Sequence, residues 1–174
     1  DESVMNAMLK DSIRLAVLMR EPSGYEIDRL KILHQAKPLY FTFAYNAIAL
    51  VKDSQSSDTM IDSLFLVNQL RNGKDLFVTT KDYVDLFQLL LGKFDIKEVK
   101  QSLKIVNTVE ELHLYLKGNT SYIGILPFSL VSNQYDPEAK EIASKFRWIG
   151  IKNAEKDTIY PSQSTIFTKE WPLV

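Results

Sequence analysis

Short apolar runs alternate with helical segments along the whole chain, and this alternation is the feature that most constrains the fold. The runs that favour strands cover residues 13–19, 76–78, 104–106, 122–126 and 146–151. Between them, apolar residues recur at the three- and four-residue spacing of amphipathic helices. Because parallel strands need a long connection, usually a helix, this order predicts an α/β protein with mainly parallel strand pairing. The 174 residues suffice for one ordinary domain or two small lobes.

Local signals predict several helix boundaries. Thr108 and Glu111 have the spacing of a capping box and predict the start of a helix. Gly92 is expected to cap the C-terminus of a helix over residues 82–91. A short helix is expected over residues 95–103.

Two further segments favour extended structure. Residues 39–51 are rich in aromatic and aliphatic side chains and predict one long strand or two joined strands. Residues 165–167 favour a strand in the tail of the chain. Hydroxyl groups at Ser162, Ser164 and Thr165 accompany this segment, but no base or oxyanion hole is evident that would make a serine nucleophilic.

Composition excludes several functional classes. The 21 basic and 22 acidic residues are balanced and form no basic cluster, so a nucleic-acid partner is not expected. The absence of cysteine removes disulfides and thiolate sites, and two histidines are too few for a histidine-rich metal site. No cofactor motif and no Gly-x-Ser-x-Gly elbow is present, so we expect neither a cofactor nor an enzyme.

Two observations concern targeting. No apolar run reaches the length of a bilayer span. The first residue is Asp1 and not Met, so we expect a trimmed or processed start with which a targeting signal can have been lost.

Arg20 is the most informative polar residue because it directly follows the apolar run over residues 13–19. Sheets of α/β proteins bind ligands at the carboxyl ends of their strands. The permanent charge and planar donors of arginine suit a phosphate, sulfate or carboxylate at such a place. Alternatively, Arg20 pairs with Glu21 or is solvated, and for a single residue the sequence favours this second interpretation.

Thr79, Thr80 and Lys81 occupy a second position of this kind, between a strand and a helix that begins near Asp82. Backbone N–H groups at a helix start can hold an anion, and hydroxyl groups add donors. Thr80 can equally serve as an ordinary N-cap, and taken alone this is the stronger interpretation. The two roles are compatible.

The histidines and one acidic pair have structural explanations. Neither His34 nor His113 has a carboxylate or a second histidine at metal-ligand spacing, so both are expected on the surface or on a helix face. Glu110 and Glu111 lie in the first turn of a predicted helix, where carboxylates suit the helix dipole. Adjacent helix residues point in different directions, so the pair is not expected to share an acid–base task.

A series of short segments runs in a recognisable order along nearly the whole chain. The segments are residues 9–16 with Arg20 and Glu21, then residues 44–51, 123–125, 149–153, 160–162 and 171–173. In this order they resemble the substrate-binding proteins of bacterial phosphate ABC transporters, in the branch of phosphate-binding-like lipoproteins. Residues 44–51 resemble the hinge strand of that family, in which position 46, here Asn46, is usually Asp.

The resemblance implies a type II periplasmic-binding-protein fold, with two lobes of mainly parallel sheet flanked by helices and joined by crossover strands. Residues 1–44 and 160–174 would form lobe I, and residues 45–159 would form lobe II. It further implies a non-enzymatic solute-binding protein that captures phosphate or a similar small oxyanion and delivers it to a membrane transporter permease. A periplasmic or other extracytoplasmic location is expected, with a lipid anchor that is not in this chain.

The same resemblance assigns ligand-binding roles. Arg20 would supply the charge, and Thr79 and Thr80 would supply hydroxyl and backbone donors from the opposite lobe. Closure about residues near Tyr45 and Thr165 would trap the ligand.

The chain also departs from the family pattern. The first strand of the family, its Ser/Gly-rich anion loop and its C-terminal helix have no counterpart, so lobe I is expected to be incomplete. At the second anion loop, Thr79, Thr80 and Lys81 replace Ser, Gly and Thr, and Met19 replaces a small or hydroxyl residue before Arg20. An alternative is therefore a binding-protein fold retained as an interaction or structural module with a decayed anion site. A third is the effector domain of a transcription regulator, although no DNA-binding segment is present.

Overall fold

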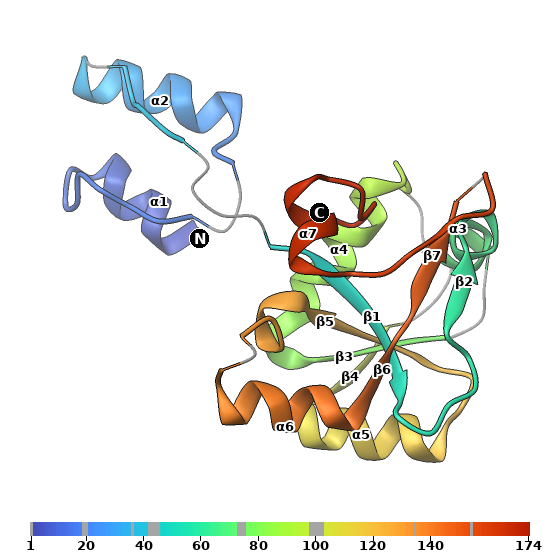
Figure 1. Ribbon diagram of the computed structural model, residues 1–174. Helices are drawn as coiled ribbons and strands as arrows, with labels where there is room; N and C mark the ends of the chain where they lie inside the picture. The colour runs from blue at the N-terminus through green and yellow to red at the C-terminus, as the bar shows by residue number, and fades with distance from the viewer. Residues whose placement is uncertain are drawn as a thin grey trace. The chain divides into compact units, whose positions relative to one another are not determined.

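The chain divides into two compact units, Asp1–Ala44 and Tyr45–Val174 (Figure 1). The computed structural model describes residues 2–18, 21–35, 37–41, 46–72, 76–97, 103–133, 135–153 and 155–174.

Unit 1 contains two helices, α1 (Glu2–Leu9) and α2 (Gly24–His34). A capping box starts α2, since the Ser23 hydroxyl accepts from the Glu26 N–H and the Glu26 carboxylate accepts from the Ser23 N–H at 2.7 Å. Among the described residues of this unit, the buried apolar side chains are Met5 and Leu30. The part of unit 1 that the structure describes therefore has very little core of its own.

The strand expected over residues 13–19 is not found in the described part of that segment. Residues 13–18 form neither strand nor helix, and the side chains of Ile13, Leu15 and Val17 are exposed. A strand exists only when a neighbour pairs with its backbone, and unit 1 contains no strand among its described residues. The expectation was wrong because an apolar run carries no information about whether a pairing partner is present.

Unit 2 carries the α/β architecture. Its elements are β1 (Ile48–Asp53), β2 (Met60–Asp62), α3 (Ser63–Asn72), β3 (Phe77–Thr80), the short helix η1 (Lys81–Tyr83), α4 (Val84–Lys93), β4 (Lys104–Val106), α5 (Val109–Gly118), β5 (Ile123–Pro127), the short helix η2 (Phe128–Leu130), α6 (Pro137–Lys145), β6 (Phe146–Trp148), β7 (Gly150–Lys152), β8 (Thr158–Ile159) and α7 (Gln163–Phe167).

Five of these strands form the main sheet in the order β4-β3-β5-β1-β6. The strand β3 pairs in parallel with both β4 and β5, whereas β1 runs antiparallel to β5 and to β6. Four strands consequently point in one direction and β1 points in the other. The predicted α/β class with mainly parallel strands and flanking helices is confirmed, with β1 as the reversed strand.

Helices cover both faces of this sheet (Figure 1). On one face, Leu112 and Leu116 of α5 pack with Val51 and Val78 in a buried cluster. Gly124 of β5 permits this approach, because a Cβ there would lie 2.6 Å from a Val51 methyl carbon and 3.0 Å from a Leu116 methyl carbon.

On the other face lies the larger core, to which α4 and the tail of the chain contribute. Phe87 and Leu90 of α4 pack with Leu50 of β1 in this cluster, which also includes Trp171 and Leu173. Two hydrogen bonds join the tail to Ile48. The Trp171 indole N–H donates to the Ile48 carbonyl at 2.9 Å, and the Ile48 N–H donates to the Leu173 carbonyl at 2.9 Å. Residues 160–174 thus belong to unit 2 here, and their assignment to a lobe with residues 1–44 stays a prediction.

A second sheet of order β2-β7-β8 accompanies the first. The strand predicted over residues 146–151 is divided between the two sheets, because β6 pairs with β1 whereas β7 pairs with β2 and β8. Between them, Ile149 is buried and its N–H donates to the Leu50 carbonyl at 2.9 Å.

Helix boundaries differ from expectation at two places. Gly92 lies inside α4, and the cap is Phe94, whose N–H donates to the Leu91 and Gly92 carbonyls. A helix over residues 95–103 is not found, since residues 95–97 are not helical and residues 98–102 lie outside the described part of the chain.

Two strand expectations are also wrong. Residues 165–167 belong to α7, because the side chains of Ser162 and Thr165 form a reciprocal capping box that starts a helix there. Within residues 39–51, strand structure begins only at Ile48, residues 39–41 form no strand, and residues 42–45 lie outside the described residues.

Candidate functional site

Thr79 and Thr80 are the last residues of the interior strand β3, and both are fully or almost fully buried. Successive residues of a strand point to opposite faces, so the two hydroxyl groups have different surroundings. The Thr79 hydroxyl donates to the Ile125 carbonyl at 2.8 Å and is committed to the β3–β5 pair. The Thr80 hydroxyl is buried and has no hydrogen-bond partner among the described residues.

The expected capping role of Thr80 is not observed. Thr80 occupies the N-cap position of η1, with extended backbone angles, but its side chain makes no capping hydrogen bond. A buried hydroxyl without a partner is unfavourable by about 1–3 kcal/mol, so such a group in a native fold needs an explanation. A ligand that accepts from it would provide one.

Polar residues gather where β3, β4 and β5 end, a region we call the carboxyl edge. Thr80 lies opposite Val106, the last residue of β4, so Lys81 and Asn107 follow at the same edge. β1 starts there too, since Ile48 lies opposite Pro127. The carboxyl edge is the place where open α/β sheets bind ligands.

Asn46 accepts two backbone hydrogen bonds at one side of this edge. Its Oδ1 accepts from the Ala47 N–H at 2.9 Å and from the Ser129 N–H at 3.4 Å. Since both partners are N–H donors, the oxygen of the Asn46 amide must face them and its NH₂ group must point away. The side chain thereby ties the start of β1 to the turn that follows β5.

The charges at the carboxyl edge are mixed. Lys81 and Asp82 are both exposed. Burial raises the pKa of the adjacent Tyr83 phenol, and the negative charge of Asp82 raises it further, so the phenol remains protonated at neutral pH. The exposed charges next to the edge are thus one ammonium group and one carboxylate, and the carboxylate opposes the binding of anions.

Arg20 lies outside the described residues, as does Met19. The ligand-binding roles of Arg20, Thr79 and Thr80 therefore stay predictions.

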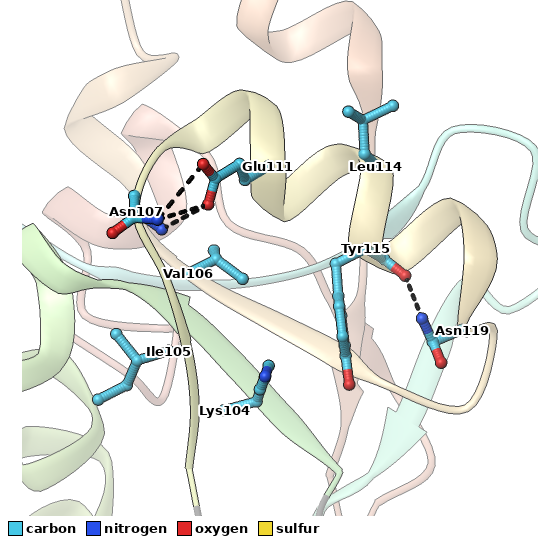
Figure 2. Close-up of a pocket in the computed structure, with 8 residues that line it drawn as sticks. All are labelled: Lys104, Ile105, Val106, Asn107, Glu111, Leu114, Tyr115 and Asn119. Carbon is cyan, nitrogen blue, oxygen red and sulfur yellow. Dashed lines mark hydrogen bonds between the residues drawn. The ribbon is translucent and has the colours of Figure 1, made fainter.

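A groove on the edge strand β4 is a second concave feature. It has a volume of about 600 Å³ and lies between β4 and α5 (Figure 2). Its walls include the exposed side chains of Ile105 and Leu114, and the Lys104 ammonium lies 5.8 Å from the centroid of the Tyr115 ring. Glu111 accepts from the Asn107 backbone N–H at 2.8 Å, one residue before the Thr108 N-cap, so the reciprocal bond of the predicted capping box is shifted by one residue.

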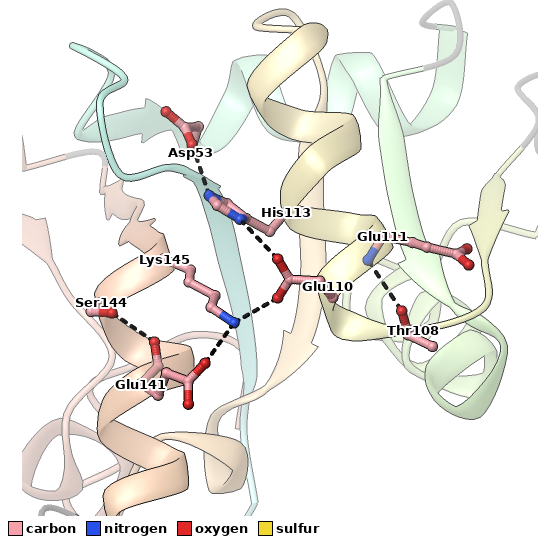
Figure 3. Close-up of polar contacts among 8 residues, drawn as sticks. All are labelled: Asp53, Thr108, Glu110, Glu111, His113, Glu141, Ser144 and Lys145. Carbon is pink, nitrogen blue, oxygen red and sulfur yellow. Dashed lines mark hydrogen bonds and ion pairs between the residues drawn. The ribbon is translucent and has the colours of Figure 1, made fainter.

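A polar cluster that sequence reasoning missed joins β1, α5 and α6 (Figure 3). It consists of Asp53, Glu110, His113, Glu141 and Lys145, which contact one another as ion pairs. The bond to Lys145 lowers the pKa of Glu110, and the bonds to Glu110 and Glu141 raise the pKa of Lys145. The helical spacings of Glu110 with His113 and of Glu141 with Lys145 can be seen in the sequence, but the contacts that join the three elements cannot.

The described residues offer neither a metal-binding cluster nor a membrane-spanning helix. No group of three or more His, Cys, Asp or Glu side chains there could hold a metal ion. No helix in the described part of the chain is long and apolar enough to cross a membrane.

Comparison with known proteins gives matches at the level of structure. No family model and no curated protein matches the sequence. An ABC-type phosphate transport receptor from Vibrio cholerae matches with a TM-score of 0.66 and 14% identity over 98% of this chain and 68% of its own. A protein assigned as a phosphate ABC transporter substrate-binding protein, with bound phosphate, from Clostridium perfringens matches with a TM-score of 0.59 and 12% identity over 98% of this chain and 67% of its own.

A candidate phosphate-binding protein from Planctomyces limnophilus matches with a TM-score of 0.61 and 14% identity over 96% of this chain and 63% of its own. The chain therefore spans 63–68% of the length of these three structures. At such identities the similarity establishes the fold, which is that of these binding proteins.

Proposed function

We propose that this chain is a non-enzymatic solute-binding protein that captures phosphate or a similar small oxyanion for an ABC transporter. The observation that carries the proposal is the match of nearly the whole chain to solved phosphate-binding proteins, one of which holds phosphate. The ordered segments that resemble this family in sequence support it independently. The proposed protein works outside the cytoplasm and passes its ligand to a membrane permease.

The unpartnered Thr80 hydroxyl supports an anion at the carboxyl edge. It is buried at the end of an interior strand with no partner among the described residues, and a ligand oxygen would be such a partner. Thr79 contributes through its backbone in this proposal, because its hydroxyl already donates to Ile125. Arg20 supplies the positive charge.

Isothermal titration of the full-length protein with phosphate, sulfate and a small carboxylate tests the proposal. We expect heat of binding with at least one of these anions. Arg20→Ala is expected to weaken that binding about 10- to 100-fold, the equivalent of roughly 1.5–3 kcal/mol for a hydrogen bond to a charged group. The absence of heat for all the anions would show the proposal to be wrong.

Arg14→Ala is the matched control. Its guanidinium is exposed and pairs with Asp11 at 3.3 Å, so its removal takes away the same charge from the same unit without touching the proposed site. Binding that falls equally in both variants would reduce the role of Arg20 to a general effect of net charge.

A protein-interaction module with a decayed anion site is the second candidate. The observation that favours it is the engagement of the Thr79 hydroxyl within the sheet, which removes one of the expected donors. Co-purification of a stable, identified protein partner by a chain that binds no oxyanion would support this candidate over the first.

A further inference from the structure

The strand β4 is a free edge of the main sheet. It pairs with β3 on one side, and no strand of the described residues pairs with it on the other. At the opposite end of the sheet, by contrast, β6 leads through Ile149 into β7 of the second sheet. An edge strand directs some of its backbone N–H and C=O groups outward, where they can pair with a further strand.

Apolar side chains are exposed beside this edge on both faces of the sheet. Ile105, in the middle of β4, is 49% exposed, and Leu114 of α5 is 59% exposed. A hollow of about 430 Å³ lies between β4 and α4, with Leu91 and Leu103 among its walls, and the groove of Figure 2 lies between β4 and α5. A strand added to β4 would therefore cover apolar surface on both faces.

The groove on the α5 face carries opposite charges near its two ends (Figure 2). Lys104 is the first residue of β4 and lies over the Tyr115 ring, whereas Glu111 bonds to Asn107, directly after the last residue of β4. Neither charge forms an ion pair with another described residue. The Glu111 Oε1 accepts from the Asn107 amide at 3.4 Å, a long bond, so this oxygen can accept a further donor.

We propose that two copies of this chain associate through β4, with their β4 strands antiparallel about a twofold axis. When Ile105 lies opposite the partner's Ile105, Lys104 lies opposite the partner's Val106 and beside the partner's Glu111. Symmetry repeats this ion pair, so the two unpaired charges of each copy are matched. The two five-stranded sheets then form one continuous sheet.

The distribution of charge selects a second copy in this orientation as the occupant. A twofold interface requires a surface that is complementary to itself, and a strand with a cation at its start and an anion at its end meets that requirement when it pairs antiparallel. A parallel pairing in register would instead place Lys104 beside the partner's Lys104. Because β4 has only three residues, we expect a weak dimer, with a dissociation constant on the order of 10–100 µM. The proposal concerns unit 2 and does not depend on the proposed ligand.

Sedimentation equilibrium of the full chain, from about 5 µM to about 500 µM, tests the dimer. Lys104→Glu and Glu111→Lys each place like charges at both contacts and should each raise the dissociation constant at least about 10-fold. A mixture of these two variants should dimerise about as strongly as the parent chain, because each contact in the mixed pair again joins opposite charges. A general loss of stability would not produce this rescue.

Lys117→Glu is the matched control. Lys117 is an exposed lysine of α5 that does not line the groove, so the same change of charge there should alter the dissociation constant by less than about twofold. A parent chain that is monomeric at about 500 µM would overturn the proposal. So would a dimer that Lys104→Glu and Lys117→Glu weaken equally, or one that the mixture fails to restore. Should Glu111→Lys fail to fold by circular dichroism, the comparison of Lys104→Glu with Lys117→Glu decides.

Discussion

Thr79 and Thr80 are neighbours of the same type with opposite energetic roles. Thr79→Val removes the donor to the Ile125 carbonyl and is expected to lower the free energy of unfolding by about 1–2 kcal/mol. Thr80→Val keeps the shape and removes a buried hydroxyl that has no partner in the described part of the chain, so it is expected to leave that free energy unchanged or raise it by up to about 1 kcal/mol. Urea denaturation of both variants measures the difference, and equal losses would contradict it. Under the proposed function, Thr80→Val also weakens oxyanion binding in a fully folded protein.

Sequence reasoning placed these two residues correctly at the end of a strand but could not distinguish them. The position followed from the apolar run and the helix start after it. Which hydroxyl is free depends on the register between β3 and β5, a non-local property. The same limit hid the contact of His113 with Asp53, because residues 60 positions apart in sequence meet only after the sheet has formed.

At the scale of elements, helices with local caps could be predicted, whereas strands depended on their partners. The Thr108 cap is present as expected, with its hydroxyl accepting from the Glu111 N–H at 3.1 Å. Residues 13–18 show the opposite case, since an apolar run without a paired neighbour forms no strand. Residues 165–167 favour strand by composition, and the Ser162 capping box overrides that preference.

The tail that contains α7 is expected to be an integral part of the unit 2 core. Trp171 is 1% exposed, and its indole donates to the Ile48 carbonyl. Trp171→Ala should therefore lower the free energy of unfolding by about 3–5 kcal/mol, through the cavity and the lost bond. Phe167→Ala, at an aromatic residue of the same tail that is 78% exposed, is the control and should change it by less than about 0.5 kcal/mol. Chemical denaturation followed by circular dichroism measures both, and similar losses would show that the tail is not anchored by Trp171.

At the scale of the whole molecule, the two units differ sharply in how much core they possess. Both buried apolar clusters consist of residues from unit 2, whereas unit 1 buries Met5 and Leu30 among its described residues. The described residues of unit 1 bury too little apolar surface to offset their conformational entropy, whereas those of unit 2 bury enough.

We therefore expect residues 45–174 to fold without residues 1–44. The shortened chain should unfold in one cooperative transition, with a midpoint within about 5 °C of that of the full chain, because no side chain of its two clusters has been removed. Limited proteolysis of the full chain should cut unit 1 first and leave a resistant fragment that retains α7, since the tail is packed on β1. A shortened chain that is unfolded would mean that unit 2 draws its stability from unit 1, and the two would then have to be treated as one folding unit.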